Sequence, residues 1–528
     1  MTTPTHATSG RPNPFRLATI LALVLILSAQ FAAGATARDS DRVANPMRLQ
    51  DTVELSLMTT VRSQEVGPPP GDWFLVQAIR DELNIDLQIN WVTAPSEYDS
   101  RLQTLAGAND LPDVFTTPPD IMSNLVNQGL VADWEPYVAT MPTYATNYRV
   151  NELAQIGTFD GTHYGLVRST TDPFKTVVSI RQDWLDRLGL AVPTTTEEYF
   201  AVMQAFTTQD PDGNGQNDTY GWTSSVNSDG EFSNFDPIFA AFGALGDWAV
   251  VDNQLVPMST TENRRQALEF IARMQAAGVI DPDWTAQTGE DRLSKWKAGR
   301  IGIFQEDWCA NYCYQGYSQF AAANPTGVLK IINPPIGPTG LSASGGYNAA
   351  GTMYGLSQQA ADAGKGEAAA RLFEWFATGG YERTAFGLEG TNYQKNPDGS
   401  ITQDTSLESV QNRQLCPFAY VGSDTEFNAR YAEVTQHTNG QTVNVPEILA
   451  QAQQLPKVDL TQFAPLPPPP AEISADFTRL RAEGEFAFAN GQRSFEEWGS
   501  YVEELNGVGL PTWVEAASER AREIGLIS

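Results

Sequence analysis

The fold of this chain is set by residues 53–89, VELSLMTTVRSQEVGPPPGDWFLVQAIRDELNIDLQI. Apolar and polar residues alternate over 53–57 and again over 85–89, which is the period of a half-buried strand. Between these stretches, apolar residues recur at helical spacing over 74–83. A strand, a helix and a second strand in this order predict parallel strands joined by a right-handed crossover.

The same alternation of elements continues along the chain. A helical stripe over 98–105 is followed by a short apolar strand at 114–115 and by a helix from 122 to 126. Gly129 then supplies the left-handed position that ends many helices. We therefore predict that the first part of the chain forms an open α/β sheet.

A second α/β region begins near residue 176. Thr195 and Glu198 form a capping box ahead of a helical stripe. The last helix is predicted to start at a similar pair, Thr512 with Glu515, and LPPPP at 466–470 predicts a stiff polyproline connector. The other predicted elements of this region are strands at 177–180, 301–304 and 331–332 and helices at 183–188 and 267–274.

The composition excludes several classes of function. The 528 residues include 33 Lys and Arg against 63 Asp and Glu, a net charge of −30. Nucleic acids and anionic membranes bind basic surfaces, so neither is expected as a main partner. The chain has only three His, which is too few for a His-rich metal site or a multi-His proton relay.

The first 37 residues have the pattern of a signal peptide. Arg11 and Arg16 precede an almost wholly apolar run over 17–27, and small residues at 33–37 offer two A-x-A cleavage sites. The alternative is a retained membrane anchor, but the apolar run is shorter than the ~20 residues that span a bilayer. We expect an exported, periplasmic or extracellular protein, and no lipobox Cys lies near the cleavage point.

The three cysteines leave two interpretations open. Cys309 and Cys313 lie four residues apart, and Cys416 stands alone. In an oxidising compartment one disulfide can form, leaving an odd thiol; otherwise these residues act as small buried hydrophobes.

Residues 210–218, DPDGNGQND, resemble the calcium loop of an EF-hand. Side-chain oxygens occupy positions 1, 3, 5 and 9, Gly215 occupies the sharp turn at position 6, and Gly221 replaces the usual acid at position 12. The alternative is a polar turn without metal. The predicted ligands of a structural Ca²⁺ are Asp210, Asp212, Asn214, Gln216 through its carbonyl, and Asp218.

Several stretches resemble the extracellular solute-binding proteins of ABC importers, family 1, in particular the large carbohydrate-binding members that include the alginate-oligosaccharide binders. The similar stretches are YDSRLQTLAGANDLPDVF (98–115), RQDWLDRLGLAVPTTTEEYFAVMQAFTTQDPDGNGQND (181–218), KAGRIGIFQEDW (297–308) and GLEGTNY (387–393). The resemblance extends over nearly all of the chain after residue 37.

The resemblance implies two α/β lobes joined by hinge strands, a periplasmic-binding-protein-like fold of type II with extra C-terminal helices. Lobe one would comprise 50–167 with 341–386, and lobe two 168–340 with 387–528. Ligand would be enclosed when the lobes close about the hinge. The partners implied are a carbohydrate and the membrane permease of an ABC importer, and we expect a monomer.

Candidate ligand-binding residues follow from the rule that open α/β sheets bind ligands at the carboxyl ends of their strands. The resemblance places Trp308 at a position whose ring stacks on sugar; core packing is the alternative. The full set is Arg62 after the first strand, Glu306, Asp307 and Trp308 after the strand ending at Phe304, and the more weakly supported aromatics Trp73, Tyr347, Tyr354 and Tyr393, for which a structural role is the alternative.

Two classes of function remain open at this point. The first is a binding component that captures an oligosaccharide, which we expect to be neutral because a chain of this net charge repels polyanions. The second is a secreted carbohydrate-active enzyme using Glu306 and Asp307, although neighbours on an extended segment point to opposite sides. A non-sugar solute such as a peptide or polyol is a further possibility.

Overall fold

The structure is a computed structural model of the chain. The predicted signal segment, Arg62, Cys313 and Cys416 lie outside its described residues. The described residues are 47–61, 67–94, 97–168, 176–226, 232–312, 316–347, 352–397, 401–404, 409, 411–415, 418 and 434–528.

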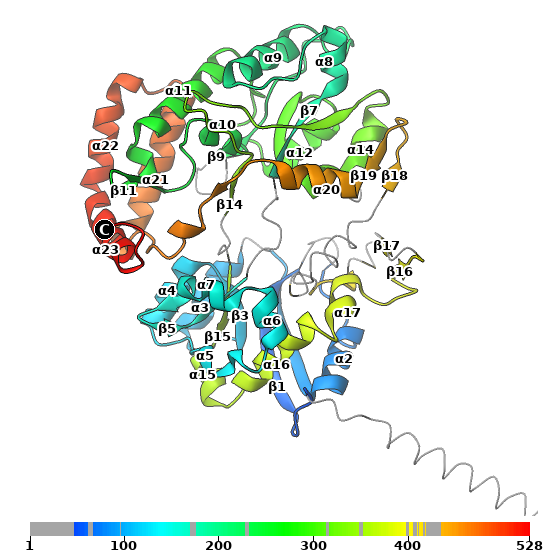
Figure 1. Cartoon of the computed structure of the whole chain (residues 1–528), viewed down its shortest axis with the longest axis vertical. Helices are drawn as coiled ribbons and strands as arrows, with labels where there is room; N and C mark the ends of the chain where they lie inside the picture. The colour runs from blue at the N-terminus through cyan, green and yellow to red at the C-terminus, as the bar shows by residue number, and fades with distance from the viewer. Residues whose placement is uncertain are drawn as a thin grey trace, which may run out of the picture.

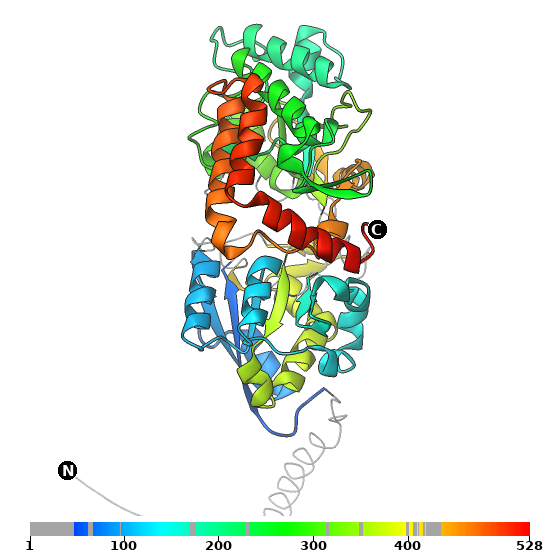
Figure 2. The same ribbon diagram turned by 90° about the vertical axis from the view of Figure 1, so that its left-hand side faces the viewer.

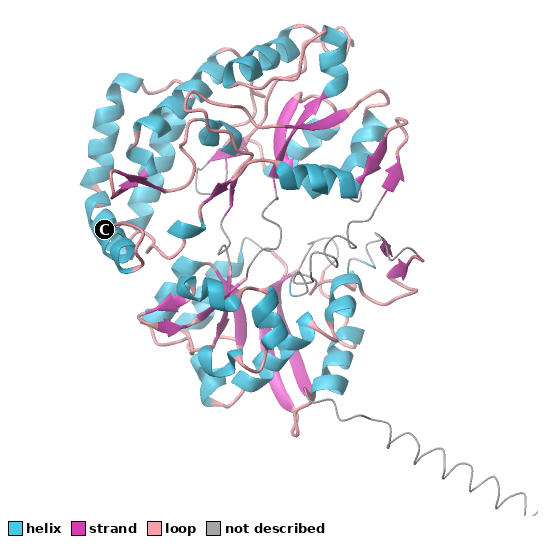
Figure 3. Ribbon diagram, in the orientation of Figure 1, coloured by secondary structure: helices cyan, strands magenta, loops and turns pink. Residues whose placement is uncertain are grey.

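Figure 1 shows two lobes, and the first is built on a five-stranded sheet (Figures 1 and 3). The strand order is β2-β1-β3-β15-β6; β1 is parallel to β2 and β3, whereas β15 is antiparallel to β3 and β6. The predicted parallel strand–helix–strand unit is confirmed. The strands are β1 (Val53–Thr60), β2 (Ile85–Val92), β3 (Val114–Thr117), β6 (Gly165–Val167) and β15 (Met353–Leu356).

Helices cover both faces of this sheet. α2 (Phe74–Leu83) packs against Leu55 and Leu57 of β1 in one buried core. α3 (Tyr98–Gly107) packs against Met58 of the same strand in a second core. Because successive strand side chains point to opposite faces, the period-two pattern of β1 places one helix on each side.

The second lobe contains a three-stranded sheet in which β7 (Thr176–Arg181) is central. β12 (Ile303–Asp307) and β13 (Leu329–Ile332) both run antiparallel to β7. The predicted strand at 301–304 is therefore displaced, and Glu306 and Asp307 lie within β12 rather than after it. The predicted helices are confirmed as α8 (Gln182–Leu188), α9 (Thr196–Thr208) and α11 (Glu262–Ala276).

Three C-terminal helices pack on the outer side of the second lobe (Figure 2). They are α21 (Ala471–Ala489), α22 (Trp498–Gly507) and α23 (Leu510–Glu523), and they share an apolar core with Trp248. α23 begins at Leu510 after the left-handed Gly509, so the predicted start at Thr512 is wrong.

Part of the chain assigned to lobe two packs in lobe one instead. Leu415 and Phe418 belong to the first-lobe core, where the Phe418 ring lies 5.3 Å from that of Tyr354. The side chain of Gln414 also donates a hydrogen bond to the carbonyl of Gly67 at 2.9 Å. The assignment of all of 387–528 to lobe two is therefore wrong at these residues, and the other boundaries stay predictions.

In the part of the chain that the structure describes, no helix is both long enough and apolar enough to span a bilayer.

Candidate functional site

A groove of about 580 Å³ lies where the two lobes face each other. The first lobe contributes Ser123 and Asn127 of α4 (Pro119–Asn127), together with Thr158 and Asp160. The second lobe contributes aromatic, proline and charged side chains: Trp248, Phe463, Pro467, Pro468, Pro469, Phe477, Arg481, Trp513, Arg520 and Glu523.

A wider hollow of about 1200 Å³ adjoins this groove. It shares the α4 residues Ser123 and Asn127 with the groove and extends along the exposed side of α21 to Glu483. The prolines of the 466–470 run line both spaces. The predicted polyproline connector therefore forms one wall between the lobes.

Buried polar side chains gather around the carboxyl end of β12. The side chain of Gln305 donates through Nε2 to Asp236 at 3.1 Å and to the Ser344 backbone carbonyl at 3.0 Å. The backbone carbonyl of Gln305 accepts from Asn234 Nδ2 at 3.0 Å. The buried Oε1 of Gln305 and Oδ1 of Asn234 have no hydrogen-bond partner among the described residues. Buried polar atoms normally find partners, so this region has hydrogen-bonding capacity to spare.

Glu306 is held by an arginine from a different element. Arg292 of α12 (Gly289–Lys297) donates from Nη2 to Glu306 Oε2 at 2.5 Å, and Glu306 Oε1 accepts from the Asp307 backbone at 2.9 Å. Nε and Nη1 of Arg292 are buried without a hydrogen-bond partner in the described chain. The Glu306 carboxylate is thus engaged through both oxygens.

Trp308 is buried rather than presented to a ligand. It starts α13 (Trp308–Tyr312), is 1% exposed and belongs to a core with Val177, Trp296 and Phe304. Asp307 just before it accepts a hydrogen bond from the Cys309 backbone at 2.8 Å. In this arrangement Trp308 offers no open face to a sugar ring, so the expected stacking role is contradicted and core packing is the outcome.

Two predicted first-lobe residues are also core residues. Trp73 is 3% exposed, and its ring lies 6.3 Å from that of Trp91. Tyr354 is 1% exposed and packs 4.9 Å from the Phe373 ring, where burial raises the pKa of its hydroxyl. Neither side chain lies at a surface that a ligand reaches.

The remaining predicted residues are Tyr393, Tyr347 and Arg62. Tyr393 is 4% exposed, and its hydroxyl donates to Glu382 at 3.3 Å; burial raises its pKa to about 12. Tyr347 lies in β14 (Gly346–Tyr347), which pairs with β20 (Val458–Asp459) beside the groove. Arg62 lies outside the described residues.

The predicted calcium loop folds around the side chain of Asn214. Its Nδ2 donates to Asp212 at 2.9 Å and to Asp218 at 3.2 Å, and the Gly215 backbone donates to Asp210 at 3.1 Å. Burial and the neighbouring carboxylates raise the pKa of Asp212. The carboxylates of Asp212 and Asp218 thus lie on either side of the Asn214 amide. Among the described residues, no group of three or more acidic, His or Cys side chains is placed to bind a metal ion.

Cys309 is disulfide-bonded. The other two cysteines of the chain, Cys313 and Cys416, lie outside the described residues. The disulfide interpretation is therefore confirmed for Cys309, and its pairing stays open.

Residues 76–390 match the family model described as bacterial extracellular solute-binding protein, which is more than half of the chain. The chain belongs to the bacterial extracellular solute-binding proteins. The sequence resemblance and the two-lobed fold that it implies are confirmed. The C-terminal helices α21, α22 and α23 lie beyond the matched residues.

Relatives of this solute-binding protein include proteins named for carbohydrates. The polygalacturonan/rhamnogalacturonan-binding protein YtcQ of Bacillus subtilis is 26% identical over 73% of this chain and 76% of its own. The structure of FusA from S. pneumoniae with kestose aligns with a TM-score of 0.65 at 16% identity, over 90% of this chain and 99% of FusA. Alginate-binding protein AlgQ2 without calcium ion aligns with a TM-score of 0.65 at 15% identity, over 90% and 99%.

Sequence reasoning missed the residues that line the described spaces of this solute-binding protein. Trp513 of α23 lines the groove, and Asp236 and Arg292 bond to Gln305 and Glu306 at the end of β12; none of these three was among the predicted site residues. The one usable signal was the unusual run of polar residues directly after the buried part of β12, QED at 305–307.

Proposed function

We propose that this protein is the substrate-binding component of an ABC importer that captures a neutral oligosaccharide between its lobes by hinge closure. The observation that carries the proposal is the groove, which both lobes line with aromatic, amide and hydroxyl side chains. Sites of this composition suit sugars, since aromatic faces cover C–H groups while polar groups take hydroxyls. The carbohydrate-binding names among its relatives point the same way.

A neutral ligand is favoured by the charges near the site. Asp236, Glu306 and Asp307 lie around the end of β12, and the chain carries a net charge of −30. Arg292 is already paired with Glu306, and Arg264, which acts on Asp236, is paired with Glu485. A uronate would meet repulsion here, although one relative is named for polygalacturonan.

Of the predicted ligand-binding residues, we retain Glu306, Asp307, Tyr347 and Arg62 as proposals. We withdraw Trp73, Tyr354 and Trp308, because they pack within the apolar cores of the two lobes. Tyr393 is also set aside, since it lies in a small first-lobe cluster with Phe386. The proposed export to the periplasm or cell exterior and docking on a permease follow from the proposed role.

Binding is tested by thermal-shift screening of the purified protein against neutral oligosaccharides, oligogalacturonates, peptides and polyols, with calorimetric titration of each hit. We expect stabilisation by a neutral oligosaccharide without release of any product. Stabilisation by oligogalacturonates alone would contradict the neutral ligand. Conversion of the bound sugar would contradict a pure binding role.

The enzymatic alternative lacks a free acid–base pair. Both oxygens of Glu306 are engaged, by Arg292 and by the Asp307 backbone, and one oxygen of Asp307 accepts from Cys309. A general acid or base needs an oxygen directed at the substrate. We therefore propose no catalytic role for these residues.

We further propose that the 210–218 loop binds a structural Ca²⁺ through Asp210, Asp212, Asn214, Asp218 and the Gln216 carbonyl. The arrangement supports this, because Asp212 and Asp218 both lie within hydrogen-bond distance of Asn214 Nδ2 and Asp210 accepts from the Gly215 backbone, so their oxygens converge on one loop. The ion would bind the carboxylate oxygens of Asp212 and Asp218, which both accept a hydrogen bond from the side-chain amide of Asn214.

Removal of this ion is expected to lower the melting temperature and leave sugar affinity unchanged, because the loop lies away from the groove. The measurement is a melt with chelator, repeated after adding back Ca²⁺ or Mg²⁺. Asp212→Asn should lose most of the response to Ca²⁺, whereas Asp252→Asn, in the exposed turn between β10 (Trp248–Val251) and β11 (Gln254–Pro257), should keep it. A melt that is indifferent to chelator would mean a turn without metal.

A further inference from the structure

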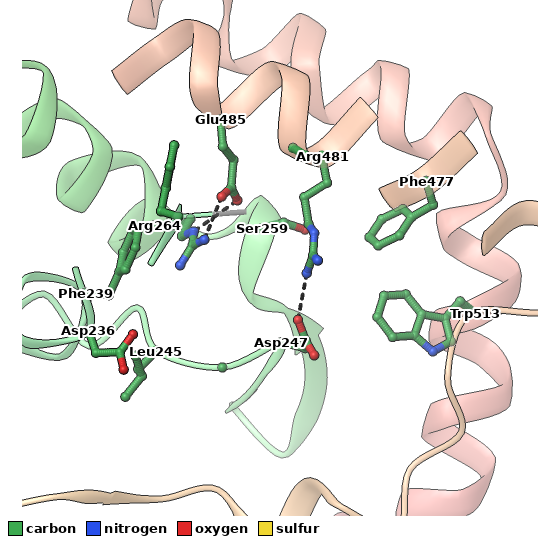
Figure 4. A pocket seen from close by; sticks show the side chains of 13 residues that line it. Asp236, Phe239, Leu245, Asp247, Ser259, Arg264, Phe477, Arg481, Glu485 and Trp513 are labelled. Carbon is green, nitrogen blue, oxygen red and sulfur yellow. Dashed lines mark hydrogen bonds and ion pairs between the residues drawn. The ribbon is translucent and has the colours of Figure 1, made fainter. Parts of the chain in front are cut away.

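A separate cavity of about 180 Å³ lies within the second lobe, beneath the C-terminal helices (Figure 4). One wall is formed by α10 (Asp236–Ala241), residues 245–247 before β10, and α11, and the opposite wall by α21 and α23. The helices of the second wall lie outside the residues that match the family model.

Aromatic rings form the inner end of this cavity. The rings of Phe477 and Trp513 lie 5.1 Å apart at 68°, and both side chains are at most 4% exposed. Trp513 Nε1 donates to the Pro467 carbonyl at 2.8 Å, which fixes the orientation of the indole. On the other side, the Arg264 guanidinium lies 3.8 Å from the centroid of the Phe239 ring.

The cavity is lined by three carboxylates and two guanidiniums. Arg264 forms two hydrogen bonds to Glu485, at 3.0 and 2.6 Å, and Arg481 pairs with Asp247 at 2.7 Å (Figure 4). Asp236 forms no ion pair with any described Lys or Arg and accepts from Gln305 at 3.1 Å. A carboxylate accepts several hydrogen bonds, so Asp236 keeps capacity for a ligand hydroxyl.

The cavity adjoins the groove between the lobes. Five residues line both spaces: Gly246, Asp247, Phe477, Arg481 and Trp513. At its other end, Asp236 is bonded to Gln305, which directly precedes Glu306 on β12. A chain lying in the groove can thus place one end in the cavity.

We propose that this cavity is a subsite for a single uncharged sugar ring at the end of a bound oligosaccharide. This proposal rests on the proposed function. It adds the place where the bound oligosaccharide ends and the kind of sugar unit that occupies that place. The cavity of about 180 Å³ can hold no more than one unit of an oligosaccharide, since a cavity of about 150 Å³ takes a single benzene. Three carboxylates against two guanidiniums that are already paired disfavour a uronate in this position.

The test is calorimetric titration with malto-, fructo- and galacto-oligosaccharides of two to six units, and with oligogalacturonates of the same lengths. In a neutral series we expect one added sugar unit to raise the affinity at least tenfold, at the chain length that first reaches the cavity. This rise is called the length step. Ser259→Leu, which fills the cavity at a residue lining no other described pocket, should abolish that step and leave the Kd of shorter chains unchanged. Ser500→Leu, on the exposed side of α22, is the matched control and should retain it.

Asp236→Asn provides a second variant that keeps the shape of the cavity. It should weaken the same step several-fold because one strong acceptor is lost. If both variants bind a neutral series and keep the rise in affinity at that chain length, the subsite is overturned and the proposed function stands. Failure of the wild-type protein to bind any of these sugars would overturn both.

Discussion

At the scale of single residues, the Arg264–Glu485 pair joins the second lobe to the C-terminal helices. Its side chains are 16% and 6% exposed, and two hydrogen bonds link them. A buried ion pair adds little over apolar residues of the same size, but loss of one partner leaves a buried charge without compensation.

We therefore expect Arg264→Ala and Glu485→Ala each to lower the free energy of unfolding by about 3–5 kcal/mol. Arg264→Met combined with Glu485→Met should lie closer to wild type than either single variant. Denaturant unfolding of the four proteins measures this. Equal and additive losses in the two alanine variants would show that the residues do not act as a pair.

His163 predicts a pH dependence of stability. It is 7% exposed, and burial lowers its pKa below 6.5, partly offset by Glu135 at 3.7 Å. The unfolded chain therefore binds a proton at higher pH than the folded one, so this contribution is present above pH 6.5 and is lost as the pH falls through the folded pKa.

Replacing His163 with Gln should make the melting temperature fall less between pH 7 and pH 5 than it does in the wild type. Glu135→Gln removes the partner that raises the pKa and should make the fall steeper. Melting curves at matched ionic strength measure both. Parallel pH profiles for the three proteins would mean that the folded-state pKa of His163 is not lowered.

At the scale of elements, α9 shows how much a local motif determines. Thr195 accepts from the Glu198 backbone at 3.3 Å, and Glu198 accepts from the Thr195 backbone at 3.1 Å, as the capping box predicts. The predicted start of α23 at Thr512 was wrong because a similar pair of residues occurs inside a helix that already begins at Leu510.

Thr195→Ala is expected to lower the free energy of unfolding by about 1 kcal/mol, because the Glu198 N–H loses its partner. Thr208→Ala, at the exposed end of the same helix, is the control and should change it by less than half as much, since its hydroxyl bonds a carbonyl within the helix. Urea unfolding compares them. An equal effect at both positions would show that the cap contributes nothing specific.

At the scale of the whole molecule, the two lobes meet across a groove that both of them line. Ser123 and Asn127 of α4 face the prolines at 467–469 across this space. A ligand that bridges the two walls stabilises the closed arrangement only by binding it more tightly than the open one.

We therefore expect the radius of gyration to decrease when a sugar identified by thermal shift is added, and to stay constant with a sugar that gives no shift. Small-angle scattering on the same sample measures both. A sugar that binds with nanomolar affinity and leaves the radius unchanged would contradict hinge closure.

The sequence by itself determined the local elements and the class of the protein. Strand and helix periods, the capping box at Thr195 and the quoted family stretches depend on neighbours in the chain, and these are visible in one dimension. The net charge of −30 is also a property of the sequence alone, and it argues against nucleic acid as a main partner.

Only the tertiary structure decided which side chains are buried in cores and which line a groove or cavity. Trp308 and Tyr354 have the chemistry of sugar-binding aromatics but lie in cores, whereas Asp236 and Trp513 were assigned no role and line a cavity. Burial depends on what packs against a residue from distant segments, such as Phe418 against Tyr354. No local pattern contains that information, so chemistry could be predicted from the sequence and accessibility could not.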